Sequence, residues 1–344
     1  MSNDEFLSQD DFWRKILQDM SSDDLVSNMV LVCKNLRQLV IQVLRERLPG
    51  TQLLQYMCSA IGRCRLQLLR EMLIQGIVAA DEGYSFALRM AANVDDLGLA
   101  RLVIEAPAAP ARPNQSGFPL MIACSNGNVN MVRLLIGATH HPAEANAMES
   151  TALCSAAFHG HLKVVRMLIN ASHHPAQANA QDSLALRFAA QNGHTKVVRT
   201  LIGASHHPAK ANAQESGALR RAASSGCLAV VCMLINMLHH PAKANARESE
   251  ALHLAASNGH TKVVRALIGA SHHPAKANAR ESQALRRAAS NGHLAVVKML
   301  IDARHNPARA NARNSEALHL AASNGHLAVV RALIGASHHP AIPP

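Results

Sequence analysis

Apolar residues recur at helical spacing in units of constant length along most of the chain. The unit at 248–280 reads ESEALHLAASNGHTKVVRALIGASHHPAKANAR, and the following unit is nearly the same. A repeat of this length is typical of proteins built by stacking one small structural unit. The clearest marker is the motif HHPA, which returns in steps of 33 residues, at His140, His173, His206, His239, His272 and His338, with the variant HNPA at His305.

Each unit predicts two helices joined by a tight turn. In the unit above, apolar residues at helical spacing predict a first helix over 250–257, with Ser249 as its N-cap. Gly259 predicts the turn, because glycine readily adopts the left-handed conformation that ends helices. A second helix is expected over 261–270, ended before Pro274. Neither helix can bury its apolar face alone, so the units are expected to stack into an all-α solenoid.

The repeated motif resembles the ankyrin repeat. The pattern ALHLAAxNGHxxVVxxLI is complete at 251–268 and 317–334. The connector SHHPAxANAxxS lacks the glycine of ankyrin fingers, so we expect loops in their place. We expect an asparagine in each connector to take the left-handed position, at Asn146, Asn179, Asn212, Asn245, Asn278 and Asn311. Altered or weaker copies give nine units across 51–344, at 53–74, 86–106, 118–138, 152–169, 185–202, 218–235 and 284–301.

Residues 1–50 do not share this period and predict a separate segment of three helices. Ser21 to Asp24 form a break and an N-cap signal between the first two helices. The segment resembles an F-box, although Ser8 and Gln9 replace the opening Leu-Pro of that family. The resemblance implies binding to the adaptor of a cullin–RING ubiquitin ligase. The residues it assigns to that contact are Phe12, Trp13, Ile16, Leu17, Met20, Leu25, Met29, Val32, Cys33 and Leu36. The alternative is a helical cap on the solenoid, which the same apolar residues would serve.

Composition narrows the possible functions. Seven cysteines without a C-x-x-C motif favour a reducing compartment such as the cytoplasm and argue against a zinc site. No apolar run is long enough to span a membrane, and the N-terminus lacks a signal-peptide pattern. No catalytic or nucleotide-binding motif occurs, so we expect a non-enzymatic protein without a cofactor.

Charge is unevenly distributed and indicates a second binding surface. The chain carries a net charge of +11, although residues 1–25 are acidic. Several basic residues of the repeats are expected on the concave face: Arg187, Arg220, Arg221, Arg286, Arg287, Lys243 and Lys276. Arg221 and Arg287 are the most informative, because ankyrin repeats usually carry an apolar residue there. Either the face binds an acidic protein partner, or it keeps the solenoid soluble. The scarcity of aromatic residues, at 3%, disfavours nucleic acid.

The histidines gather in the repeats. We expect those of the HHPA motifs to pack on helix ends and satisfy terminal carbonyls, with a pH-responsive surface as the alternative. Neighbouring rungs of the stack are too far apart to share a metal ion easily. The N-G-H histidines are expected to stabilise the turn between the helices: His161, His194, His260, His293 and His326.

The last unit is as apolar as an internal one. Leu333 and Ile334 are expected to face inward, whereas Leu327 and Ala328 have no later repeat in the sequence to cover them. This edge is therefore expected to support self-association or to bind a partner.

Taken together, the sequence predicts an adaptor that joins a ubiquitin ligase to a protein substrate, with an ankyrin scaffold or inhibitor as the alternative. F-box–ankyrin chains of this kind resemble effectors of intracellular bacteria and large viruses, which implies action in a host cytosol.

Overall fold

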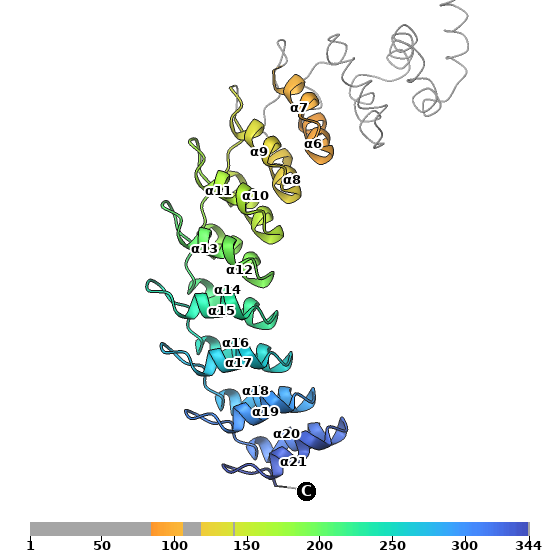
Figure 1. Cartoon of the computed structure of the whole chain (residues 1–344), viewed down its shortest axis with the longest axis vertical. Helices are drawn as coiled ribbons and strands as arrows, with labels where there is room; N and C mark the ends of the chain where they lie inside the picture. Colours follow the sequence, from red (N-terminus) through yellow and green to blue (C-terminus); the bar gives the residue numbers. More distant parts are fainter. Residues whose placement is uncertain (1–83, 106–117, 140–141, 343–344) are drawn as a thin grey trace, which may run out of the picture. The chain divides into compact units, whose positions relative to one another are not determined.

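The computed structural model describes residues 84–105, 118–139 and 142–342, and every regular element in these ranges is an α-helix (Figure 1). The described helices pair in chain order, and we call the first of each pair helix A and the second helix B. Their bounds are α6 Tyr84–Val94, α7 Leu97–Ile104, α8 Phe118–Asn126, α9 Val129–Ile136, α10 Ala147–His159, α11 Leu162–Ile169, α12 Ala180–Gln191, α13 Thr195–Ile202, α14 Ala213–Ser224, α15 Leu228–Ile235, α16 Ala246–Ser257, α17 Thr261–Ile268, α18 Ala279–Ser290, α19 Leu294–Ile301, α20 Ala312–Ser323 and α21 Leu327–Ile334. The predicted all-α class is confirmed.

The chain divides into two compact units, at Met1–Ala147 and Met148–Pro344. Within the first, α6 packs on α7 and α8, and α8 packs on α9. Within the second, the A helices from α12 to α20 contact one another in sequence, and each packs on its own helix B. The predicted N-terminal segment and the weak repeat at 53–74 lie outside the described residues, so the boundary at residue 50 stays a prediction.

Each helix A of the second unit contains, near its start, a left-handed turn of three residues. In α16, these residues are Arg247, Glu248 and Ser249, with φ values of 47°, 57° and 67°. Asn245 has a φ of −87°, so the expected left-handed asparagine is wrong. Ser249 is also not the expected N-cap, because its hydroxyl accepts from the backbone N–H of Lys276, in the connector that follows the same pair of helices, at 2.8 Å. Without this contact, the backbone N–H of that connector would lose its partner within the chain.

This serine contact recurs in every pair of the second unit. The serine is nearly or wholly buried in each case, and the acceptor–donor distance lies between 2.8 and 3.0 Å. It joins the left-handed turn at the start of helix A to the connector that follows helix B of the same pair. The residue pairs are Ser150–Gln177, Ser183–Lys210, Ser216–Lys243, Ser249–Lys276, Ser282–Arg309 and Ser315–Ile342.

The turn between helices A and B confirms the predicted roles of glycine and histidine. Gly259 has a φ of 72°, which glycine adopts without steric cost. The Nε2 atom of His260 lies 3.0 Å from the carbonyl oxygen of Ser224 in the preceding repeat, and therefore donates to it. His194, His293 and His326 make the equivalent contact. These rings therefore satisfy carbonyls at the end of the neighbouring helix A.

The core consists of small aliphatic side chains from both helices. In α17, Val263, Val264 and Leu267 are buried. The helix ends at Ile268, where Gly269 donates its N–H to the carbonyl of Arg265 at 3.0 Å. The end therefore precedes Pro274 by several residues, and the proline does not cause it.

The connectors are loops, as expected from their lack of ankyrin finger glycines, and they project on one side of the stack in the second unit (Figure 1). His272 and His273 are exposed. Their rings were expected to satisfy helix carbonyls, and in the structure they do not. Instead, the backbone carbonyl of His273 accepts from the N–H of Asn245 in the preceding connector, at 3.1 Å. This bond links successive loops without forming a strand within the described residues.

Candidate functional site

The A helices of the second unit carry the sequence-predicted arginines on a common surface, which we call the helix-A face. Equivalent residues on this face lie one repeat apart, because the helices stack in register. One row of equivalent positions is Arg187, Arg220, His253, Arg286 and His319. The three arginines of this row are partly buried, so their side chains are constrained by neighbouring groups.

Arg220 and Arg286 hold neighbouring repeats together. Arg220 Nη1 lies 2.9 Å from Glu250 Oε2, and its Nη2 donates to the carbonyl of Gln214 at 3.1 Å. Arg286 pairs in the same way with Glu316 at 2.8 Å. Each guanidinium thus bridges the left-handed turn of its own repeat and a glutamate of the next repeat. The two arginines were predicted as partner-binding residues. In the structure their guanidinium groups are already paired with carboxylates of the same chain.

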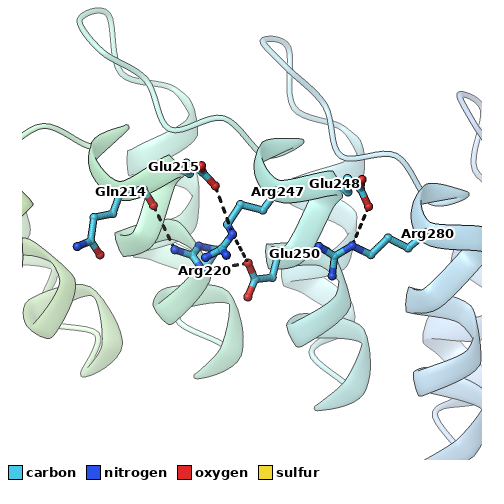
Figure 2. A network of polar contacts seen from close by, with 7 residues as sticks. All are labelled: Gln214, Glu215, Arg220, Arg247, Glu248, Glu250 and Arg280. Atoms are coloured by element: carbon cyan, nitrogen blue, oxygen red, sulfur yellow. Dashed lines mark hydrogen bonds and ion pairs between the residues drawn. The ribbon is translucent and has the colours of Figure 1, made fainter.

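A second series of ion pairs follows the outer edge of the same face (Figure 2). Arg247 lies 3.3 Å from Glu215, and Arg280 lies 2.8 Å from Glu248. An equivalent pair joins Arg313 to Glu281. These side chains are substantially exposed, so each pair contributes little to stability alone. These pairs matter more for the recognition of a charged partner than for stability, because the acidic and basic side chains along this edge neutralise one another's charge.

Arg187 departs from this pattern. The residue one repeat further on, which corresponds to Glu250 and Glu316, is Gly217. Arg187 therefore has no carboxylate within ion-pair distance among the described residues, and donates instead to the side chain of Gln214 and to the carbonyl of Gln181. Burial and the neighbouring charge of Arg221 lower the pKa of Arg187. An arginine without a paired carboxylate is a favourable site for an anionic ligand group.

Arg221 lies next to it and also lacks a carboxylate partner among the described residues. Its Nη1 donates to Gln191 Oε1 at 2.5 Å, and its guanidinium carbon lies 5.6 Å from the ring centroid of Phe188. A guanidinium over an aromatic face keeps its charge while its orientation is restricted. The Phe188 ring in turn packs edge-to-face on Phe158.

These residues line a cleft of about 370 Å³ between the A helices. Gly217, which has no side chain, is one of the residues that line it. Its walls carry two arginines without carboxylate partners, one arginine paired with Glu250, and neutral groups. The lining residues are Arg187, Gln191, Gln214, Gly217, Arg220, Arg221, Ser224, Ser225 and Leu254.

The other predicted basic residues lie outside this cleft. Arg287 is exposed and makes no hydrogen bond or ion pair with the part of the chain that the structure describes. Lys243 and Lys276 are exposed, and it is their backbone N–H groups that contact the buried serines. They add positive charge beside the face without lining its cleft.

His253 replaces arginine in the same row and is almost completely buried, at 4% exposure. Burial lowers its pKa to about 4, and the nearby positive charge of Arg280 acts in the same direction. Its Nε2 atom is buried without a hydrogen-bond partner. The ring is therefore neutral at physiological pH and belongs to the interior of the repeat.

The described residues contain no group of three or more histidines, cysteines or acids placed to hold a metal ion. Burial raises the pKa of Cys154 to about 11 and also raises that of Cys124. Both thiols are therefore protonated and weakly nucleophilic. No helix in the described ranges is long and apolar enough to cross a membrane.

Comparison with protein families matches the ankyrin repeats, described as three copies, at residues 88–182, 219–311 and 252–342. These ranges cover more than half of the chain. The chain belongs to the ankyrin-repeat family. This assignment confirms the predicted solenoid fold, and the fold is one that typically binds proteins rather than catalyses reactions.

Among solved structures, the ankyrin repeat domain of Bcl-3, described as a unique member of the IkappaB protein family, is similar at 24% sequence identity. The match has a TM-score of 0.47 and covers 62% of this chain and 97% of that chain. No curated protein sequence matches this ankyrin-repeat chain.

Sequence analysis identified the arginines but missed the cleft between them. Gln191, Gln214 and Gly217 carry no motif, and their grouping depends on the stacking of successive repeats. One signal was present in the sequence, because the positions equivalent to Gly217 hold Leu184, Glu250, Gln283 and Glu316, so that Gly217 is the one without a side chain.

Proposed function

We propose that this ankyrin-repeat protein is a non-enzymatic adaptor whose helix-A face binds an acidic segment of a partner protein. The observation that carries this proposal is the positive charge of Arg187 and Arg221 in an open cleft, beside a face on which the other charged residues are mostly paired. Complementary charge favours encounter with an acidic surface and disfavours basic partners. Nearby Phe188 adds apolar contact area.

The site supports protein more than nucleic acid. Phosphate binding depends on several accessible cations along a path, and here Arg220 and Arg286 are already paired with glutamates. The outer edge of the face also alternates acid and base, which repels a polyanion as often as it attracts one. A short acidic segment requires only the local charge of the cleft.

The test is retention of partners from a eukaryotic lysate on the immobilised full chain. The informative variant combines Arg221→Glu with Arg287→Glu, because these two side chains lack ion-pair partners within the described residues. We expect it to lose the retained proteins while remaining folded, although Arg221→Glu also removes the contacts with Gln191 and Phe188. Retention of the same proteins by this variant would contradict binding through the helix-A face.

We further propose that residues 1–50 are an F-box that docks on the adaptor of a cullin–RING ubiquitin ligase, so that the bound protein becomes a ubiquitination substrate. Support comes from the sequence pattern alone, including Asp24-Leu25 and the Val32-Cys33-Lys34 run in register. The contact residues proposed from it lie outside the described residues. This assignment implies action in the cytosol, and the resemblance to effectors implies a host cytosol.

Binding of purified adaptor to the full chain and to a chain lacking residues 1–48 tests this second proposal. Micromolar binding by the full chain and none by the truncated chain is expected. If the full chain does not bind, the alternative holds, in which an ankyrin scaffold or inhibitor acts without a ligase and its N-terminal helices cap the solenoid.

A further inference from the structure

We infer that the cleft at Gly217 is a receptor for one carboxylate side chain of the partner, which takes the place that a glutamate occupies in other repeats of this chain. The inference rests on the proposed function and specifies its chemistry. It follows from comparing equivalent positions of successive repeats, which the stack places in equivalent surroundings.

The chain itself defines what this position accepts. Arg220 pairs with Glu250, and Arg286 pairs with Glu316, at 2.9 and 2.8 Å. In both pairs the carboxylate comes from the following repeat, at the same sequence separation. By this register, the partner of Arg187 would be the side chain of residue 217, and glycine supplies none.

Gly217 leaves this position without a carboxylate, and it is among the residues that line the cleft of about 370 Å³. A Cβ atom at Gly217 would lie 3.1 Å from Cδ of Arg187, 3.5 Å from Cβ of Gln214 and 3.7 Å from Nη2 of Arg220. The aliphatic stem of Arg187 therefore packs against the buried glycine. A carboxylate entering the cleft from solvent would meet the guanidinium groups of Arg187 and Arg221, which line it without carboxylate partners.

Other hydrogen-bonding capacity in the cleft is incomplete. The Nε atoms of Arg187 and Arg220 are buried without a partner in the described residues. The acid that most affects Arg187 is Asp182, whose Oδ2 accepts from Nε2 of Gln214 at 3.3 Å. Gln214 thus lies between this acid and the arginine. A ligand carboxylate would give Arg187 the charge-assisted contact that Gln214 now replaces with a neutral one.

The geometry selects a side chain of an acidic segment. The cleft is bounded by the A helices on either side, and Arg221 lies on its rim over Phe188. One carboxylate can enter over Gly217 while a second, further along the segment, reaches Arg221. A segment with neighbouring Asp or Glu residues therefore fits better than a single isolated acid.

The experiment measures binding of a fluorescein-labelled hexaglutamate peptide to the full chain by fluorescence polarisation, with hexaglutamine as the neutral probe. Gly217→Glu supplies the carboxylate from the chain itself, and Arg187→Gln removes its receptor. Each is expected to weaken hexaglutamate binding about tenfold, the loss of one charge-assisted hydrogen bond. Gln283→Glu is the matched control, because it adds the same charge at the equivalent position two repeats later, next to His253.

Gln283→Glu is expected to change binding by less than about twofold, since it leaves the cleft unchanged. Gly217→Glu is also expected to raise the thermal midpoint, because the chain then completes the Arg187 pair internally. If Gly217→Glu and Gln283→Glu weaken hexaglutamate binding equally, the inference that the cleft receives a carboxylate is overturned. It is also overturned if only Arg221→Glu reduces hexaglutamate binding. These two results leave the proposed acidic partner intact. Failure of the unmodified chain to prefer hexaglutamate over hexaglutamine would overturn both.

Discussion

At the scale of single residues, the glycine between helices A and B has two separable roles. Gly259 and Gly325 both have left-handed φ values, 72° and 74°. A Cβ atom on Gly259 would lie 2.8 Å from the His293 ring, whereas nothing lies within 4 Å of the same atom on Gly325. The first position therefore combines a backbone requirement with close packing against the next repeat. The second has only the backbone requirement.

Alanine substitutions separate these contributions. Gly325→Ala is expected to lower the free energy of unfolding by about 1–2 kcal/mol, the cost of a left-handed alanine. Gly259→Ala is expected to cost about 1–3 kcal/mol more, because the His293 ring must move. Urea denaturation followed by circular dichroism measures both. Equal losses would mean that the turn histidine does not pack as described.

A second single-residue prediction concerns pH. Burial lowers the folded-state pKa of His253 from 6.5 to about 4, so the unfolded chain binds a proton there at higher pH than the folded chain. The stability contributed by the neutral ring is fully present above pH 6.5 and is lost as the pH falls towards 4. The loss amounts to at most about 3 kcal/mol.

Replacing His253 by glutamine should remove this component, so that the variant loses less stability than the parent chain on acidification. His319 occupies the equivalent position in the last repeat and is exposed, so His319→Gln serves as the control. Thermal midpoints at pH 7 and pH 4.5 give the comparison. Parallel behaviour of all three proteins would show that His253 titrates normally in the folded chain.

At the scale of the structural element, the left-handed turn near the start of each helix A is held by contacts with residues further along the chain. In α18 this turn includes Arg280, whose carbonyl accepts from Nη2 of Arg286 in the same helix at 3.3 Å. The Arg286 side chain is only 13% exposed and also pairs with Glu316. Non-glycine residues in left-handed conformations cost energy, so these bonds stabilise a turn that its own residues disfavour.

Neighbouring arginines of one helix should therefore respond differently to mutation. Arg286→Gln is expected to lower the free energy of unfolding by about 1–2 kcal/mol, since it removes two charge-assisted hydrogen bonds from a partly buried site. Arg287→Gln, at an exposed position, is expected to change it by less than about 0.5 kcal/mol. Chemical denaturation of the two variants provides the test. If both substitutions lower the free energy of unfolding equally, Arg286 contributes no more to stability than an exposed residue.

Local signals were sufficient to predict the helix pairs, and they failed where the conformation depends on residues distant in sequence. The spacing of Val263, Val264 and Leu267 gave the second helix, and Gly259 gave the turn, because each acts through its own backbone or periodicity. Nothing in Arg247 or Glu248 themselves favours a left-handed φ. That conformation accompanies contacts with residues distant in sequence, such as the bond from the N–H of Lys276 to the hydroxyl of Ser249, 27 residues apart.

The candidate site was predictable in the same partial way. The arginines were predicted as basic residues of one face, with Arg221 and Arg287 out of the ankyrin pattern, but their division into paired and unpaired groups was not predicted. The pairs Arg220–Glu250 and Arg286–Glu316 join residues far apart in sequence and require the register of the stack. Once that register is known, Gly217 can be recognised as the position at which Arg187 lacks the carboxylate partner that Arg220 and Arg286 have.

At the scale of the whole molecule, the last described repeat carries exposed apolar residues. Leu327 is 69% exposed, as expected, and Ile334 is also exposed, whereas it was expected to face inward. Leu333 is fully buried, in agreement with the prediction. Ile342 adds to the apolar surface, although its backbone N–H still reaches Ser315.

We propose that the chain of 344 residues self-associates through this edge. Light scattering across a concentration series should show a rising mass that Leu327→Glu abolishes. Leu238 is 94% exposed in a connector away from the edge, so Leu238→Glu is the matched control and should leave association unchanged. A constant monomer mass, or equal effects of the two substitutions, would contradict association through the edge.

The central claim is that a partner protein contacts the cleft on the helix-A face. Site-specific photocrosslinking tests it most directly, with benzoylphenylalanine in place of Gln214 at the cleft or of Lys262, which is exposed on the second helix of a repeat. After irradiation in lysate, the account predicts a crosslinked partner from position 214, suppressed by excess hexaglutamate, and none from position 262. Crosslinking from position 262 alone, or from position 214 without competition by hexaglutamate, would contradict it.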